Sequence, residues 1–215
     1  MYKKKPLFIV FEGVEGCGKS YQSKKLFNKL KKIKIKAILT REPGGTKSAE
    51  MIRNLILKDY FSKESREKFD KYTDTLLYLA ARNEHIKNKI KPALDAKNIV
   101  ICDRFTDSTL AYQVHGKKVN INFINNAHKY ILNGLKPTIT FILKVSVNSS
   151  RARLKKRRTK NRYDNFAQSF YTKAQKSFLK IAKNKKNYFV LNSSNNDSIL
   201  EQKIFKIVCK YLNLK

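Results

Sequence analysis

The chain has 215 residues, of which 41% are hydrophobic, and 48 lysines and arginines against 16 aspartates and glutamates give a formal net charge of +32. We expect one domain over residues 1–215 with a sizeable core, since no apolar stretch is long enough to cross a membrane. The three cysteines are isolated and odd in number, which argues against a disulfide framework and a zinc site. The first apolar run is too short for a secretory signal, so we expect a cytoplasmic protein.

Short apolar runs alternate with longer helix-like segments along the chain. The runs are continuously apolar and rich in β-branched residues, which is typical of parallel strands buried on both faces. This alternation predicts an α/β fold in which a five-stranded parallel sheet is flanked by helices and ligands gather beyond the carboxyl ends of the strands. The predicted strands are residues 7–11, 37–40, 99–102, 139–143 and 188–191, and the predicted helices are residues 21–32, 49–58, 74–90, 120–132, 166–183 and 199–212.

Residues 13–20 follow the first predicted strand and read G-x-x-x-x-G-K-S, the pattern of a loop that binds the phosphates of a nucleoside triphosphate. Its glycines let backbone N–H groups turn toward phosphate oxygens, and the helix that follows adds a partial positive charge. We expect Lys19 to contact the β- and γ-phosphates and the Ser20 hydroxyl to bind Mg²⁺. The predicted ATP-binding residues of the loop are Gly13, Glu15, Gly16, Cys17, Gly18, Lys19 and Ser20.

Two further motifs come directly after predicted strands. Asp103 and Arg104 follow the third strand, where the carboxylate suits Mg²⁺, directly or through a water, and the guanidinium suits a phosphate. After the second strand, T-R-E-P-G-G-T at residues 40–46 places Arg41 beside paired glycines. This run predicts either a second turn that holds an anion or an ordinary tight turn.

The phosphate loop, T-R-E-P-G-G-T, A-A-R at residues 80–82, D-R-F at 103–105 and S-T-L-A-Y-Q at 108–113 occur in the order and approximate spacing of thymidylate kinases. The chain resembles that family over nearly its whole length. These enzymes phosphorylate dTMP to dTDP with ATP. The resemblance implies a three-layer P-loop kinase fold with a basic lid at about residues 150–166, Mg²⁺ bound together with ATP, dTMP as the acceptor, and a homodimer.

The resemblance also implies roles around the acceptor. Glu15 would accept a hydrogen bond from the sugar 3′-hydroxyl, and arginines would hold the acceptor phosphate. Tyr78 would stack on thymine in place of the family's usual phenylalanine, and Arg82, on the same helix face, would bond its O4. Tyr112 would lie where a 2′-hydroxyl would clash. The implied substrate-binding residues are Glu15, Arg41, Pro43, Arg53, Tyr78, Arg82, Arg104, Ser108, Thr109, Tyr112 and Gln113.

The basic stretch over residues 151–162 follows the fourth predicted strand and, on composition alone, fits a solvated face, a nucleic-acid patch or a mobile lid. In thymidylate kinases that have an acid and no arginine in the phosphate loop, this segment supplies the catalytic arginine, and this loop has Glu15 and no arginine. The dTMP phosphate would then attack the γ-phosphorus in line, without a general base. The expected catalytic residues are Lys19, Arg104, Arg158 and Arg162, and Arg153 is expected to bind ATP.

Two alternatives fit part of the sequence. A deoxynucleoside kinase would share the phosphate loop but would carry a carboxylate base for a hydroxyl acceptor, whereas Arg41 and Arg104 together favour a phosphate acceptor. A basic nucleic-acid-binding NTPase would fit the net charge. However, the lysines run through the whole chain among asparagines and isoleucines, which is typical of a drift in residue usage, and no aromatic residues are interleaved with the dense basic cluster at residues 151–158. We therefore expect no nucleic-acid partner.

Overall fold

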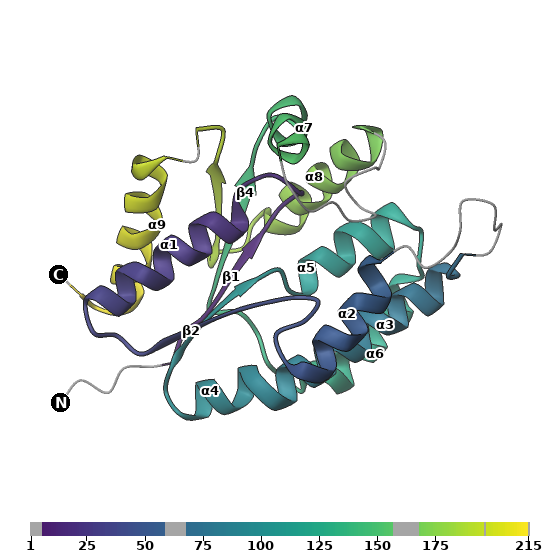
Figure 1. Cartoon of the computed structure of the whole chain (residues 1–215), viewed down its shortest axis with the longest axis horizontal. Helices are drawn as coiled ribbons and strands as arrows, with labels where there is room; N and C mark the ends of the chain where they lie inside the picture. Colours follow the sequence, from purple (N-terminus) through teal and green to yellow (C-terminus); the bar gives the residue numbers. More distant parts are fainter. Residues whose placement is uncertain (1–5, 59–67, 157–167, 196, 215) are drawn as a thin grey trace.

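The computed structural model describes residues 6–58, 68–156, 168–195 and 197–214. They contain five strands: β1 (Phe8–Glu12), β2 (Ala37–Arg41), β3 (Ile99–Asp103), β4 (Ile139–Lys144) and β5 (Tyr188–Asn192). All pair in parallel, in the spatial order β2-β3-β1-β4-β5 (Figure 1). The predicted five-stranded parallel sheet is therefore confirmed, and each strand ends one residue later than predicted.

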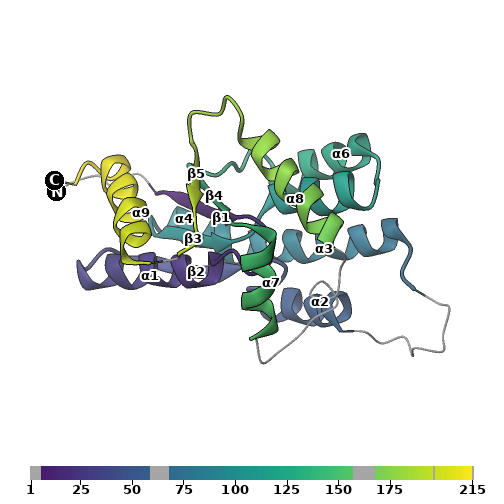
Figure 2. The ribbon, with the colours of Figure 1, turned by 90° about the horizontal axis from the view of Figure 1, so that it is seen from above.

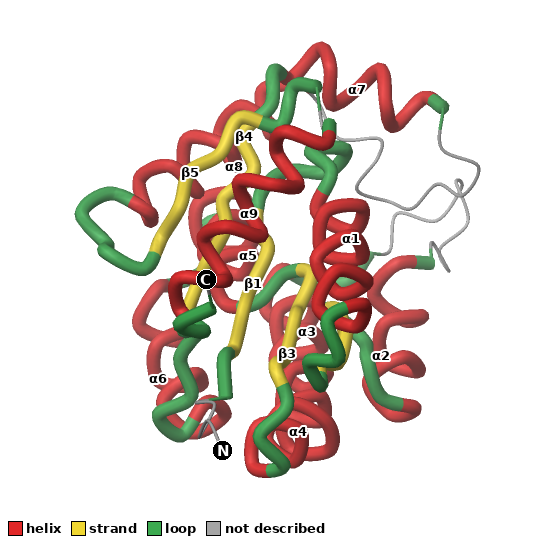
Figure 3. The backbone as a smooth tube through the Cα atoms, turned by 90° about the vertical axis from the view of Figure 1, so that its left-hand side faces the viewer, coloured by secondary structure: helices red, strands yellow, loops and turns green. Residues whose placement is uncertain are grey.

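Helices on both faces of the sheet give three layers. The helices α1 (Lys19–Lys32) and α9 (Ser198–Tyr211) pack together on one face, whereas α4 (Lys91–Asp95) and α8 (Gln168–Ala182) lie against the other (Figures 2 and 3). The remaining helices are α2 (Lys47–Leu57), α3 (Lys71–His85) and α6 (Ile121–Leu132), which gather at the right of Figure 2, and α5 (Thr106–Thr109) and α7 (Val147–Lys155), which follow β3 and β4. Within the described residues, no helix has a run long and apolar enough to cross a membrane.

The central strand is apolar at successive positions because both of its faces are covered. Every residue of β1 is buried. Phe8 and Val10 belong to one apolar cluster, and Ile9 and Phe11 to another. Successive side chains of a strand point to opposite faces, so a sheet between two helical layers needs apolar residues at both.

The strand register brings the predicted motifs to one edge of the sheet. Phe11 of β1 and Arg41 of β2 both pair with Asp103 of β3. The backbone N–H of Arg104 then donates to the Phe11 carbonyl at 2.9 Å, which extends the pairing one residue beyond β3. Because parallel strands end at a common edge, the phosphate loop and the two arginine motifs meet there.

The helix predicted over residues 74–90 differs from the one observed. Asp70 accepts a hydrogen bond from the backbone N–H of Tyr72 at 2.7 Å and caps α3, so the helix begins earlier than predicted. It ends in a π-helical turn, η1 (Ile86–Ile90), that leads into α4. Pro92 of α4 lacks an N–H and its ring crowds the preceding turn, and a wider turn directly before it relieves this clash.

No element is predicted over residues 106–116, where the structure forms α5 and the π-helical η2 (Leu110–Gly116). The residue before α5 gives it no side-chain cap. Glu12 of β1 caps it instead, accepting hydrogen bonds from the backbone N–H groups of Phe105 at 2.7 Å and Ser108 at 3.1 Å. A cap supplied from a distant strand leaves no signal in the local sequence.

Candidate active site

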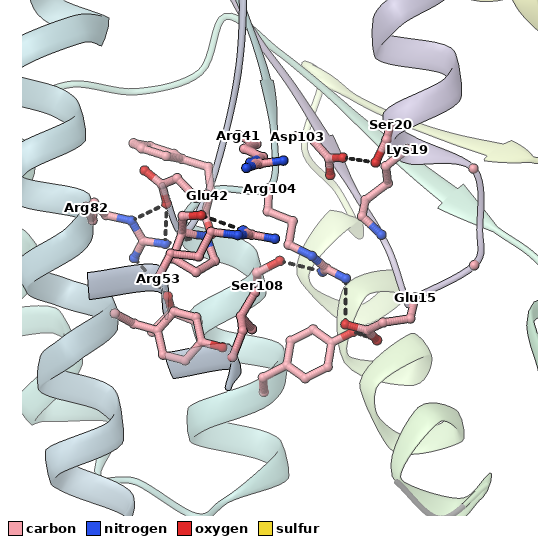
Figure 4. A pocket seen from close by; sticks show the side chains of 18 of the residues that line it. Glu15, Lys19, Ser20, Arg41, Glu42, Arg53, Arg82, Asp103, Arg104 and Ser108 are labelled. Atoms are coloured by element: carbon pink, nitrogen blue, oxygen red, sulfur yellow. Dashed lines mark hydrogen bonds and ion pairs between the residues drawn. The ribbon is translucent and has the colours of Figure 1, made fainter. Parts of the chain in front are cut away.

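A cleft of about 570 Å³ opens at the carboxyl edge of the sheet. Its walls come from the β1–α1 loop, from the ends of β2 and β3, and from α2, α3, η2 and α7. Figure 4 shows Lys19 and Ser20 on one side of the cleft, Glu42 and Arg82 on the opposite side, and Arg104 between them. Because Arg41 and Arg53 also line the cleft, positive side chains lie on both sides of it.

The loop between β1 and α1 turns through three glycines in the left-handed region, with φ of 137° at Gly13, 70° at Gly16 and 97° at Gly18. A side chain at Gly13 would lie 2.6 Å from a carbonyl oxygen of β4, so only glycine fits there. Lys19 begins α1, is 6% exposed and donates from Nζ to the Val14 carbonyl at 2.8 Å. A triphosphate in this loop would meet that ammonium group at a helix N-terminus.

Ser20 and Asp103 meet beside the loop, where the Ser20 hydroxyl donates to the Asp103 carboxylate. A hydroxyl and one carboxylate are oxygen ligands that suit Mg²⁺, which takes its other ligands from water and substrate phosphates. Within the described residues, no group of three or more His, Cys, Asp or Glu could hold a metal ion without such help. The pair therefore fits a Mg²⁺ ion that arrives with a nucleotide.

Arg104 lies at the centre of the cleft. Its guanidinium donates to the Gly13 carbonyl and to Ser108 Oγ, each at 3.0 Å, and to the Glu15 carboxylate at 2.8 Å. It also lies 5.2 Å from the centre of the Tyr112 ring, whose hydroxyl donates to the second Glu15 oxygen at 2.6 Å. Burial lowers the pKa of Arg104, but Tyr112 and Glu15 outweigh burial and raise this pKa well above its ordinary value. Arg104 is therefore a fixed positive charge.

Glu12 supports the turn that carries Arg104, and sequence reasoning missed it. The side chain is fully buried; in addition to its two backbone bonds to α5, Oε2 accepts a hydrogen bond from Ser108 Oγ at 2.6 Å. Burial and the neighbouring Asp107 raise the pKa of Glu12 to about 8, against the opposite effects of Arg104 and the hydrogen bonds. Ser108 thus links Glu12 to Arg104.

Arg82 forms one wall of the cleft and is 3% exposed. Nε donates to the Glu42 carboxylate at 2.8 Å, and Nη2 forms an ion pair with it at 2.7 Å. Nη1 donates to Thr109 Oγ1 and His128 Nε2, each at 2.8 Å, and Nη2 donates to the Phe105 carbonyl at 2.9 Å. Burial and Arg82 lower the pKa of His128 to about 3, so its neutral ring accepts this bond. A contact from Arg82 to a base stays a prediction, and it requires one of these bonds to open.

The T-R-E-P-G-G-T turn holds an anion, and that anion is the chain's own carboxylate. Glu50 accepts a hydrogen bond from the Gly45 N–H at 2.9 Å and from Arg41 Nη2 at 3.1 and 3.2 Å. Arg53 Nε lies 3.9 Å from the same carboxylate, and its Nη1 donates to the Pro43 carbonyl at 2.5 Å. The turn therefore binds a carboxylate of the chain itself, and its binding of a ligand phosphate stays a prediction.

The wall opposite the phosphate loop offers groups that could contact a base. Tyr78 of α3 and Thr109 line it, together with Gln113 of η2. Gln113 is 2% exposed, and its Nε2 has no hydrogen-bond partner in the part of the chain that the structure describes. Leaving a buried donor unpaired costs about 1–3 kcal/mol, which favours a ligand that offers an acceptor there.

Comparison with known proteins agrees with this geometry. The family model described as thymidylate kinase matches residues 11–204. The chain belongs to the thymidylate kinase family.

Individual thymidylate kinases match nearly the full chain. The thymidylate kinase of Sulfurihydrogenibium sp. (strain YO3AOP1) is 40% identical over 184 residues, covering 86% of this chain and 87% of the relative. That of Onion yellows phytoplasma (strain OY-M) is 39% identical over 209 residues, covering 94% and 98%. The crystal structure of thymidylate kinase from Ehrlichia chaffeensis has a TM-score of 0.73 at 31% identity and covers 94% of this chain and 98% of that one.

Most site residues predicted from the motifs and from the thymidylate kinase resemblance come together in the structure. Of those within the described ranges, all but Gly13 and Cys17 line the cleft. Cys17 is fully buried, and burial raises the pKa of its thiol, which fits a packing role. Arg158 and Arg162 lie outside the described residues.

Arg153 of α7 contacts two loops rather than open solvent. Its guanidinium donates to the Gly16 carbonyl at 3.3 Å, to the Ser193 carbonyl at 3.0 Å and to the Ser194 carbonyl. It therefore ties the phosphate loop to the turn between β5 and α9. It also lines the cleft, so its expected contact with ATP stays a prediction.

Three carboxylates that organise the site were not predicted. Glu12 and Glu42 are buried at the ends of β1 and β2, and Glu50 lies in the first turn of α2. For Glu12 the available signal was an acid placed directly after an apolar run, where a buried partner is needed, whereas Glu42 and Glu50 follow no such run. That signal does not say which group is the partner.

Replacement of Glu42 by alanine should destabilise the fold strongly. Arg82 and His85 lower the pKa of Glu42 against the effect of burial, so the carboxylate is charged and balances a buried guanidinium. Removing one partner of such a pair costs about 3–5 kcal/mol, whereas breaking an exposed pair costs about 1 kcal/mol or less. Urea unfolding of Glu42→Ala and of Arg41→Ala, whose pair with Glu50 is exposed, measures the difference. Equal losses would contradict the buried pair.

The raised pKa of Glu12 should make stability depend on pH. Because its pKa rises from 4.5 to about 8 on folding, the folded state binds the proton more tightly, so this contribution is greatest below pH 4.5 and falls as the pH rises toward 8. The loss approaches about 1.4 kcal/mol per pH unit for one group. Glu12→Gln cannot titrate, so its free energy of unfolding should fall less than that of the wild type between pH 5 and 8. Parallel curves would show that Glu12 does not titrate there.

Proposed function

We propose that this protein transfers the γ-phosphate of ATP to dTMP and forms dTDP, the precursor of dTTP. The family match over residues 11–204 supports the reaction class. The observation that carries the proposal is the presence, in one cleft, of a phosphate loop and of three further arginines, Arg41, Arg53 and Arg104. A triphosphate alone needs only the loop, so the second cationic end suits an acceptor that is itself a phosphate.

The donor would lie along the phosphate loop. Backbone N–H groups of the loop and the Lys19 ammonium would hold the β- and γ-phosphates at the start of α1. Ser20 and Asp103 would hold Mg²⁺, which when bound neutralises charge on the phosphates of the nucleotide. These residues orient the donor toward the centre of the cleft.

The acceptor phosphate would face the γ-phosphate across Arg104. A phosphate oxygen is already a nucleophile, so no side chain has to remove a proton. The barrier comes instead from bringing two anions together, and the arginines offset that repulsion and fix the line of attack. Arg104 suits this role because its network holds it in place and its raised pKa keeps it charged.

The nucleoside of the acceptor would lie against the wall of the cleft formed by α3 and η2. Glu15, held by Arg104 and Tyr112, would accept a hydrogen bond from the 3′-hydroxyl. Tyr78 would stack on the base, and the unpaired Nε2 of Gln113 would donate to a base acceptor. Discrimination against dUMP should be limited, since one methyl group contributes only about 1–3 kcal/mol.

A lid arginine would complete the site. We propose Arg158 or Arg162, in the segment that follows α7, as the residue that meets the transferring phosphoryl group, an effect typically worth about 10³–10⁵-fold in rate. Arg153 would hold the phosphate loop against the β5–α9 turn while ATP binds. Closure of the lid would exclude water and suppress ATP hydrolysis.

A coupled assay of ADP release, with ATP and Mg²⁺, should separate this proposal from its alternatives. We expect strong turnover with dTMP, weaker turnover with dUMP and none with thymidine. Lys19→Ala should abolish turnover and leave the circular dichroism spectrum unchanged. Turnover with thymidine but not dTMP would indicate a nucleoside kinase, and hydrolysis that only DNA or RNA stimulates would indicate a nucleic-acid-dependent NTPase.

We also propose that the protein is a homodimer in the cytoplasm. The helices α2 and α3 pack against each other, and both leave large apolar side chains exposed: Met51 is 72% exposed, Leu55 43% and Leu76 52%. Large apolar side chains exposed on two neighbouring helices favour a protein partner. Sedimentation equilibrium should give twice the mass of one chain, and the mass of a single chain at micromolar concentration would contradict the dimer.

A further inference from the structure

The carboxylate of Glu50 lies among the groups proposed to hold the acceptor phosphate. Its two oxygens accept hydrogen bonds from Arg41 Nη2 at 3.1 and 3.2 Å, and one of them lies 3.9 Å from Arg53 Nε. One oxygen also accepts a hydrogen bond from the backbone N–H of Gly45 at 2.9 Å. A single carboxylate thus joins the end of β2, the turn after it and the first helical turns of α2.

The turn is shaped around this carboxylate. Gly44 and Gly45 have φ of 125° and 94°, which side chains rarely adopt. A side chain at Gly44 would run into the Glu50 carboxylate and would lie 3.3 Å from Arg53 Cδ. The internal carboxylate therefore explains the glycine at residue 44. A side chain at Gly45 would instead lie 2.5 Å from Thr40 Oγ1 and 2.6 Å from the His85 ring, so neither glycine needs a ligand to account for it.

Glu50 is itself held independently of the arginines. Thr46 caps α2 by accepting a hydrogen bond from the Ala49 N–H at 3.2 Å, and the Glu50 N–H donates to the Thr46 carbonyl at 2.8 Å. An acid in the first turn of a helix is stabilised by the helix dipole. Burial alone would raise the pKa of Glu50, but the Gly45 N–H and Arg41 outweigh it and lower this pKa, so the group is charged.

Arg41 depends on this anchor more than the other arginines of the cleft do. Its side chain is 55% exposed, and Glu50 is the one group among the described residues to which it is seen to bond. Only Nη2 is engaged, which leaves Nε and Nη1 available to a phosphate. A long side chain with no anchor would lose conformational freedom each time an acceptor binds.

We propose that Glu50 is a positioning residue for the acceptor phosphate, holding Arg41 and Arg53 in their binding arrangement before the nucleotide arrives. The inference rests on the proposed function, since it assigns the acceptor phosphate to this end of the cleft. A phosphate would join Glu50 on Arg41 rather than displace it, because different nitrogens serve the two anions. The two guanidinium groups exceed the one carboxylate in charge, so a net attraction for the phosphate remains.

Steady-state kinetics of Glu50→Ala, Glu50→Gln and the wild type test this role. Glu50→Ala should raise the KM for dTMP about tenfold and change the KM for ATP less than about twofold. Glu50→Gln should recover most of the loss, because the amide oxygen can still accept from the Gly45 N–H and from Arg41. In the Arg41→Ala background, Glu50→Ala should raise the KM for dTMP by a smaller factor than it does in the wild type.

A matched control is Glu84→Gln. Glu84 of α3 accepts hydrogen bonds from Ser48 Oγ at 2.9 Å and Asn88 Nδ2 at 3.0 Å, so it also contacts the start of α2, but it bonds neither arginine. Its kinetic constants should match the wild type. Equal increases in both KM values for Glu50→Ala, or full additivity with Arg41→Ala, would indicate a structural role alone and overturn the proposal. A lower KM for dTMP in Glu50→Gln would show that Glu50 competes with the phosphate, which also overturns it.

Binding of dTMP without ATP keeps the two proposals separate. Isothermal titration calorimetry should give a dissociation constant for dTMP about tenfold higher in Glu50→Ala than in the wild type. If the wild type binds dTMP without turning it over, the proposed reaction is wrong, while the ratio of the two dissociation constants still tests the role of Glu50. If the wild type turns dTMP over and the ratio is near one, the reaction stands and the role of Glu50 fails.

Discussion

Repulsion between like charges is the constraint on which the whole cleft depends. Its lining brings together the cations Lys19, Arg41, Arg53, Arg82 and Arg104. Apart from Arg41, which is exposed, these cations are buried or half-buried, so they repel strongly and need fixed acceptors before any substrate binds. The chain supplies three carboxylates for this purpose. Glu42 is buried with its partner arginine and shapes one wall of the cleft. Glu15 and Glu50 each leave some N–H groups of their partner arginine available to a ligand.

The strands could be predicted from the sequence because burial on both faces of the sheet requires consecutive apolar residues, which are visible locally. A run such as residues 7–11 has no polar interruption, and its boundaries follow from composition. The segment after β3 has no such run. Its helix is capped by Glu12, whose carboxylate lies 93 residues earlier in the chain than Phe105. The wider turn before Pro92 likewise results from a clash between neighbouring turns, which hydrophobic periodicity does not encode.

The site could be predicted as far as strand order places it. The positions of Asp103 and Arg41 follow from the rule that parallel strands have their carboxyl ends at one edge of the sheet. The order of the motifs along the chain also predicts which residues line the acceptor side of the cleft. The pairing of charges could not be predicted, because it depends on distances across the fold. Arg82 looks in sequence like an arginine free for a ligand, yet all of its donors serve the protein in this structure. The sequence also does not show that Gln113 is buried with an amide nitrogen that has no partner among the described residues.

The packing of α7 against the phosphate loop has an evolutionary consequence. A side chain at Gly16 would lie 2.5 Å from the Ser150 carbonyl oxygen and 3.2 Å from Leu154 Cγ, in a backbone conformation that disfavours any side chain. An arginine at this point of the loop and α7 in its present position therefore exclude each other. Evolution could therefore place an arginine at residue 16 only together with further changes that move α7 away from the loop.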